Sequence, residues 1–116
     1  MLDKKYYLET FDMFRSSCGE ESEFRLCIEE MSELTKELCK FMRYSRNEKS
    51  QENDEKLKQI KSNIIEETAD VLICASQIMH IVGEDEVKKV MDYKIQRGRK
   101  IVEDYINKTK NQPKKD

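Results

Sequence analysis

Two acidic motifs in this chain have the residue types and the spacing of a divalent-metal site. The sequence reads EEMSE at 29–33 and EETAD at 66–70. In each motif two carboxylates lie three residues apart, which places both on one side of a helix. If the two helices face one another, they present four carboxylates, and such hard oxygen ligands are those that Mg²⁺ prefers. The four are Glu30 and Glu33 in the first motif and Glu67 and Asp70 in the second.

Long helices are predicted to position these motifs. Among its 116 residues the chain has 40% charged residues but only three Gly and one Pro, a composition that favours helix, and it lacks the alternation typical of strands. We expect an all-α, four-helix-bundle-like domain over 1–110 and a disordered basic tail over 111–116. The helices are predicted at roughly 3–16, 21–44, 55–82 and 85–109, with a mobile connection at 45–54 and a helix end at Gly83.

Glu67 breaks the amphipathic pattern of the helix predicted at 55–82. On a helical wheel it falls inside an arc of apolar side chains, and Asp70 lies at the edge of that arc. A buried carboxylate costs several kcal/mol unless it is protonated, paired or bound to a metal, so Glu67 needs a partner. The apolar arc comprises Ile60, Ile64, Val71, Cys74 and Ile78.

The second half of the same helix predicts self-association. Between Val71 and Val82 only Ser76, Gln77 and His80 are polar. A helix that is apolar nearly all round is expected to be buried nearly all round, which a single layer of four helices does not achieve. We therefore expect a homodimer or a higher homo-oligomer such as a tetramer, with this helix near the interface.

Other candidate ligands have competing interpretations. Lys94 lies within the apolar stripe of the helix predicted at 85–109, and Arg97 lies on its flank. Lys94 either extends to solvent, or pairs with one of the four carboxylates, or supplies a positive charge for phosphate. His80, the only histidine, is better explained as a hydrogen-bonded core residue than as a metal ligand. The four cysteines form no Cys-x-x-Cys pair, which predicts reduced thiols rather than a zinc site.

Charge and hydropathy argue against two classes of function. The net charge is −2 and the basic residues cluster only at 108–115, so no nucleic-acid partner is predicted. No segment approaches the about 18 consecutive apolar residues of a membrane span. The N-terminus lacks the apolar run of a signal peptide, and we expect a cytoplasmic protein.

The double motif resembles the signature of the MazG-like all-α nucleoside triphosphate pyrophosphohydrolases, in which Glu-Glu-x-x-Glu is followed, after a spacer, by Glu-x-x-Asp. The similarity covers residues 20–106. It implies a Mg²⁺-dependent hydrolase, with Mn²⁺ able to substitute, that converts a (deoxy)nucleoside triphosphate or a non-standard nucleotide to the monophosphate and pyrophosphate. The implied metal ligands are Glu30, Glu33, Glu67 and Asp70, the implied general base is Glu29, Glu66 or Glu33, and the implied phosphate contacts are Lys94 and Arg97.

Two alternatives stay open at this point. In the first, the protein is a non-catalytic helical interaction module, whose acids form salt bridges to Lys94, Arg97 and Arg99. In the second, it is a phosphoribosyl-ATP pyrophosphohydrolase of the same fold. The sequence does not identify the base or the sugar of a substrate.

Overall fold

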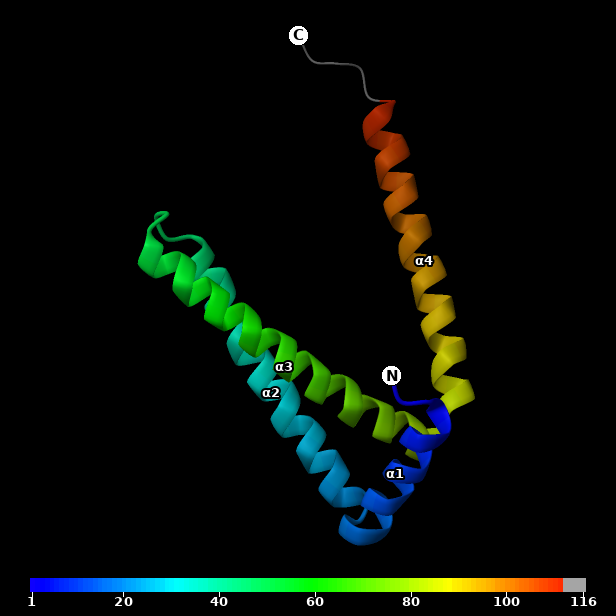
Figure 1. Cartoon of the computed structure of the whole chain (residues 1–116). Coiled ribbons are helices and arrows are strands. Elements are labelled where there is room, and N and C mark those ends of the chain that lie inside the picture. The colour runs from blue at the N-terminus through cyan, green and yellow to red at the C-terminus, as the bar shows by residue number, and fades with distance from the viewer. Residues whose placement is uncertain (112–116) are drawn as a thin grey trace. The chain divides into compact units, whose positions relative to one another are not determined.

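Four α-helices make up almost all of the structure (Figure 1). The computed structural model describes residues 1–111, and the prediction of a disordered basic tail concerns residues that, except for Asn111, lie outside this range. Within the described range there is no strand, so the all-α prediction is confirmed. No helix formed by these residues combines the length and the apolar character needed to cross a membrane. The helices are Lys4–Cys18 (α1), Glu20–Ser45 (α2), Gln51–Val82 (α3) and Glu84–Lys110 (α4).

The chain divides at Gly83 into two compact units. The first contains α1, α2 and α3, and the second contains α4. Taken by itself, α4 follows the charge order that a helix dipole favours, with acids in its first turn and Lys108 and Lys110 in its last turn. The single domain predicted over 1–110 and the predicted oligomer stay predictions.

The helices α2 and α3 form an antiparallel hairpin that makes up most of the first unit (Figure 1). The connection between the two helices is short, residues 46–50, because α3 begins as early as Gln51. Ser50 caps this helix: its hydroxyl accepts a hydrogen bond from the backbone N–H of Asn53 at 3.0 Å. Glu52 and Asp54 follow in the first turn, where the helix dipole favours acids. Residues 51–54 are therefore helical and do not belong to the connection, contrary to the predicted boundary.

Helix α1 packs against the ends of α2 and α3 that lie away from the connection (Figure 1). Its one buried side chain is Phe11. Asp12 Oδ1 lies 2.8 Å from Nε2 of His80 on α3, so the histidine is hydrogen-bonded, as predicted. Gly19 has a φ of 84°, a conformation that side chains disfavour, and it turns the chain from α1 into α2.

The second half of α3 is only partly covered in the protomer. Leu72 and Val82 are 63% and 59% exposed, whereas the polar Gln77 is 3% exposed. The sequence predicts that a single protomer leaves part of this segment uncovered, which agrees with these exposures, and its burial in an oligomer stays a prediction. Within the first unit, α1 and α2 cover one side of this segment, where Cys74 and Gln77 are buried and His80 meets Asp12, and they leave Leu72 and Val82 open.

Candidate metal centre

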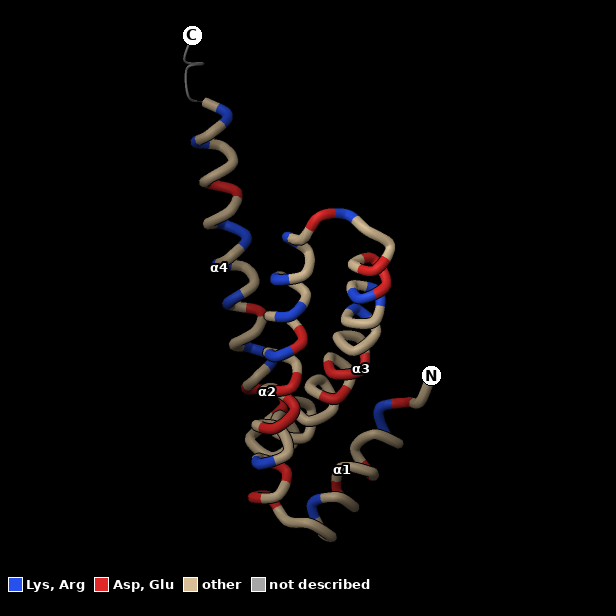
Figure 2. Tube along the Cα trace, turned by 90° about the vertical axis from the view of Figure 1, so that its left-hand side faces the viewer, with Lys and Arg blue, Asp and Glu red and all other residues tan. Residues whose placement is uncertain are grey.

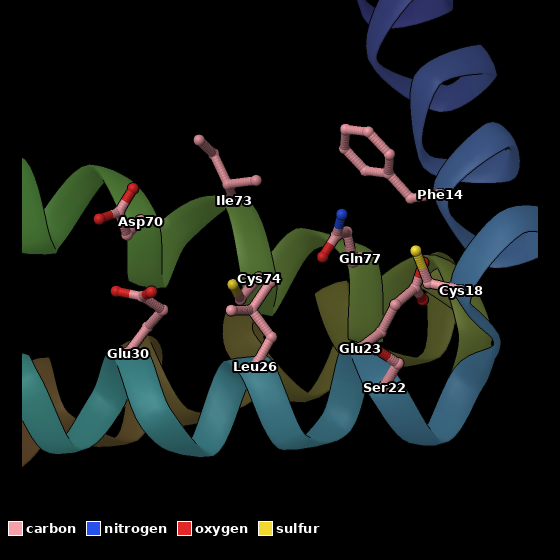
Figure 3. Close-up of a pocket in the computed structure, with 10 residues that line it drawn as sticks. All are labelled: Phe14, Cys18, Ser22, Glu23, Leu26, Glu30, Asp70, Ile73, Cys74 and Gln77. Atoms are coloured by element: carbon pink, nitrogen blue, oxygen red, sulfur yellow. The ribbon is translucent and has the colours of Figure 1, made fainter.

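Three of the four predicted metal ligands converge between α2 and α3. Glu30 on α2 and Glu67 and Asp70 on α3 each offer one carboxylate oxygen, and the three oxygens lie within 4.8 Å of one another. All three side chains are partly buried. Figure 3 shows Glu30 on α2 and Asp70 on α3 at the same end of the pair of helices. We call Glu30, Glu67 and Asp70 the acidic cluster.

Helical periodicity explains why Glu67 lies in this interface. Ile60 and Cys74 each lie seven residues from it, about two turns away in either direction, and both are buried, at 7% and 3% exposure. The side of α3 that packs on α2 therefore continues through Glu67. This is the apolar arc that the sequence predicted, and the structure confirms its position.

Glu67 has an oxygen that nothing in the described protein satisfies. Its Oε2 is buried and has no hydrogen-bond partner. The pKa of Glu67 is raised to about 7, first by a side-chain hydrogen bond with Glu30, then by burial, and then by repulsion from Glu30, Asp70 and Glu33. Within residues 1–82, no Lys or Arg forms an ion pair with the acidic cluster. The cluster thus concentrates negative charge without a compensating cation.

A second buried carboxylate in the same hairpin shows the contrast. Glu37 is 8% exposed, and its oxygens accept hydrogen bonds from Lys40 Nζ at 3.3 Å and from Asn63 Nδ2 at 3.4 Å. Lys and Arg positions are frequent on α2 toward the connection (Figure 2), whereas the acidic cluster lies further from it. Glu37 is therefore neutralised within residues 1–82, and the acidic cluster is not.

The donor set of the acidic cluster fits a hard divalent cation. Ligand oxygens at about 2.1 Å from Mg²⁺ are at most about 4.2 Å apart, a span that small side-chain rotations reach from the observed separation. Three carboxylates leave coordination positions for water and phosphate oxygens. The neighbouring Cys74 is a poor ligand for the cation because its thiol stays protonated. Burial, followed by the charges around it, raises the pKa of this thiol to about 11.

The other predicted site residues lie outside this group of three. Glu33 is exposed and is not part of the acidic cluster, although its charge contributes to the raised pKa of Glu67. Glu29 and Glu66, the predicted general bases, are also exposed. Lys94 and Arg97 are exposed side chains of α4, in the second unit, and their contact with phosphate stays a prediction.

A pocket of about 270 Å³ adjoins the acidic cluster. Figure 3 shows its lining, with Glu30 and Asp70 at one end and Leu26, Ile73 and Cys74 in the middle. At the other end polar side chains lie beside Phe14 and Cys18. Sequence reasoning missed the polar end. Gln77 had a signal, as a polar residue on an otherwise apolar helix, whereas Glu23 resembled any other acid in a first helical turn. In this order, the lining includes Glu30 and Asp70, then Leu26 and Ile73, then Glu23 and Gln77.

Without metal, the protein should lose stability as the pH rises from about 4.5 to about 7. Folded Glu67 keeps its proton to a pKa of about 7, whereas the ordinary value of 4.5 applies to the unfolded chain. The native state then binds more protons than the unfolded state in this window, so the free energy of unfolding falls with rising pH. Urea unfolding in EDTA between pH 4.5 and 8 measures this. Glu67→Gln should flatten the dependence, and an unchanged slope in that variant would contradict the assignment.

Comparison of the chain with protein-family models, with curated proteins and with solved structures finds no match. The relation to MazG-like pyrophosphohydrolases therefore stays a resemblance, carried by the two motifs.

Proposed function

We propose that this protein is a Mg²⁺-dependent nucleoside triphosphate pyrophosphohydrolase, which converts a nucleoside triphosphate and water to the monophosphate and pyrophosphate. One observation carries the proposal. Glu30, Glu67 and Asp70 converge within 4.8 Å, and Glu67 Oε2 is buried without a partner. A cation supplies what this arrangement lacks, and a polyphosphate is a natural further ligand of that cation.

The chain's own residues would divide the work as follows. Glu30, Glu67 and Asp70 hold the cation, and Glu33, Glu29 or Glu66 accepts the proton of the attacking water. Bound Mg²⁺ would supply positive charge to the phosphate oxygens and lower the pKa of water. Water attacks the α-phosphorus, and the bond from that phosphorus to the oxygen that leads to the β-phosphorus breaks, so pyrophosphate leaves with the bridging oxygen.

A screen for pyrophosphate release tests this proposal. The purified protein is incubated with canonical and modified nucleoside triphosphates, and with phosphoribosyl-ATP, in millimolar Mg²⁺ or in EDTA. We expect stoichiometric monophosphate and pyrophosphate from at least one nucleoside triphosphate, in Mg²⁺ only. Turnover of phosphoribosyl-ATP alone would replace the proposed substrate class, and no turnover of any nucleotide would overturn the proposal.

The alternative of a non-catalytic interaction module has less support from the first unit. Such a module would use its acids in salt bridges between helices. Within residues 1–82 the acidic cluster has no ion-pair partner. Glu37, by contrast, pairs with Lys40 on its own helix and accepts a hydrogen bond from Asn63 across the hairpin. An unpaired, partly buried group of carboxylates weakens a purely structural protein and is useful to one that binds a cation.

We also propose that the protein forms a homodimer or a higher homo-oligomer. Large apolar side chains on α2 and α3 remain exposed in the protomer, such as Ile28 at 60%, Ile65 at 65% and Leu72 at 63%. Burial of such side chains against a second copy would be favourable by about 25 cal/mol per Å² of apolar surface. Sedimentation velocity measures the assembly, and a monomer at micromolar concentration would contradict it.

A further inference from the structure

Two side chains that line the far end of the pocket each carry a buried oxygen without a partner. Glu23 is 5% exposed and Gln77 is 3% exposed, and both line the pocket. Oε1 of each side chain is buried and lacks a hydrogen-bond partner within the described residues. Native proteins leave few such groups unsatisfied, so each one calls for an explanation such as a ligand. The amide oxygen of Gln77 is an acceptor, and so is the oxygen of Glu23 when its carboxyl group is ionised, so the missing groups are hydrogen-bond donors.

The order of side chains along the pocket gives the shape of the missing ligand. The acidic cluster lies at one end, and Glu23 and Gln77 lie at the other (Figure 3). Between them the lining is largely apolar, with Leu26 from α2 and Ile73 from α3. A fitting ligand therefore has an anionic part that reaches the acidic cluster through a cation, a flat apolar body, and N–H donors at its far end.

The size of the pocket limits what enters it. Its volume of about 270 Å³ is slightly below the roughly 300 to 1,000 Å³ of typical small-molecule sites. It suits one ring system with its immediate substituent, rather than an entire triphosphate. Phosphate groups would lie outside it, at the end where Glu30 and Asp70 are found.

We propose that this pocket binds a nucleobase with an exocyclic amino group, which donates hydrogen bonds to Glu23 and Gln77. The inference rests on the proposed function, which supplies a nucleotide to the acidic cluster, and it adds the class of base. An amino group satisfies both orphan oxygens, as carboxylates and amides do when they read amino groups of DNA bases. An oxo group at the same position is itself an acceptor. It would face the oxygens of Glu23 and Gln77 without a donor, and all three oxygens would stay unsatisfied.

Matched pairs of substrates that differ at this position test the inference. We compare dCTP with dUTP and ATP with ITP, in which an oxo group replaces the amino group. In Mg²⁺, kcat/KM should favour the amino-bearing member of at least one pair by about tenfold or more, the size expected when a site built for a hydrogen bond meets an analogue without it. The variants are Glu23→Met and Gln77→Met, which remove the acceptors but keep the length of the side chain.

Each variant should bring the ratio within a pair toward one, mainly by lowering kcat/KM for the amino-bearing nucleotide. Both should fold, since each replaces an unsatisfied buried oxygen by an apolar group, and circular dichroism checks this. The control is Glu21→Met. Glu21 lies on the same turn of α2, its side chain is 79% exposed, and it pairs with Arg25, so this variant should keep the ratio of the unaltered protein.

The outcomes separate this inference from the proposed function. Turnover of both members of each pair at equal kcat/KM, or a preference that survives both substitutions, overturns the inference and leaves the proposed function standing. If no nucleotide is turned over, the proposed function fails, and calorimetry with cytidine and uridine then tests the pocket directly. Binding of cytidine in preference to uridine supports the inference, and equal or absent binding overturns it.

Discussion

Replacement of Glu67 by Gln should abolish Mg²⁺-dependent pyrophosphate release while the chain stays helical. The substitution keeps the size of the side chain but removes one negative charge from the acidic cluster, and Asp70→Asn removes another. We expect kcat/KM to fall by more than about 100-fold in each variant, because even residues that only orient metal ligands contribute about 10- to 100-fold to metal affinity or activity. Initial rates of pyrophosphate release measure the effect.

The control for this experiment is Glu55→Gln. Glu55 is an exposed acid of the same helix, and it lies more than three turns from Glu67. It should keep full activity, and far-ultraviolet circular dichroism should give the same helix content in all three variants. Full activity in both Glu67→Gln and Asp70→Asn would remove the acidic cluster from the catalytic site.

The same substitution should have the opposite effect on the protein without metal. A hydrogen bond with Glu30, burial, and repulsion from Glu30, Asp70 and Glu33 raise the pKa of Glu67 to about 7, so the ionised side chain is unfavourable in the folded protein at pH 8. Glu67→Gln removes this charge and should raise the melting temperature in EDTA at pH 8. In the unaltered protein, Mg²⁺ at about 100 times its Kd should add about 2.7 kcal/mol to the free energy of unfolding. That corresponds to several degrees in melting temperature for a chain of this size.

Melting curves with and without Mg²⁺ measure both effects on the same samples. The expected pattern is a crossing: the variant melts higher than the unaltered protein in EDTA and gains little from Mg²⁺. NaCl at matched ionic strength controls for charge screening, which would act on every exposed acid. An equal Mg²⁺ response in both proteins would show that the ion binds elsewhere, and no response in either would favour the interaction module.

The helices were predictable because residues near their ends determine where each helix begins and ends. Gly19 and Gly83 both adopt positive φ and end helices close to the predicted positions. The start of α3 was missed, although Ser50 with Glu52 and Asp54 after it is a recognisable N-terminal pattern, because the absence of apolar residues at 45–54 favoured a loop.

Only those site residues were predictable whose burial follows from the periodicity of a single helix. Glu67 stands out on the wheel of a single helix, and the structure places it as expected. The burial of Glu23 and Gln77 depends on how α1, α2 and α3 meet, which periodicity within one helix does not encode. For the same reason the sequence did not distinguish Glu33, which is exposed, from Glu30, one helical turn earlier on α2.

The acidic cluster lies far along both helices from the connection that joins them. Glu30 precedes Ser45, the last residue of α2, by 15 residues, and Glu67 follows Gln51, the first of α3, by 16. At about 1.5 Å per residue, more than about 20 Å of helix separates the carboxylates from residues 46–50. The length of the spacer between the two motifs can therefore change without moving the acidic cluster. Paired turns added to both helices would lengthen the arm, and a module fused at its tip would leave the register of the cluster unchanged.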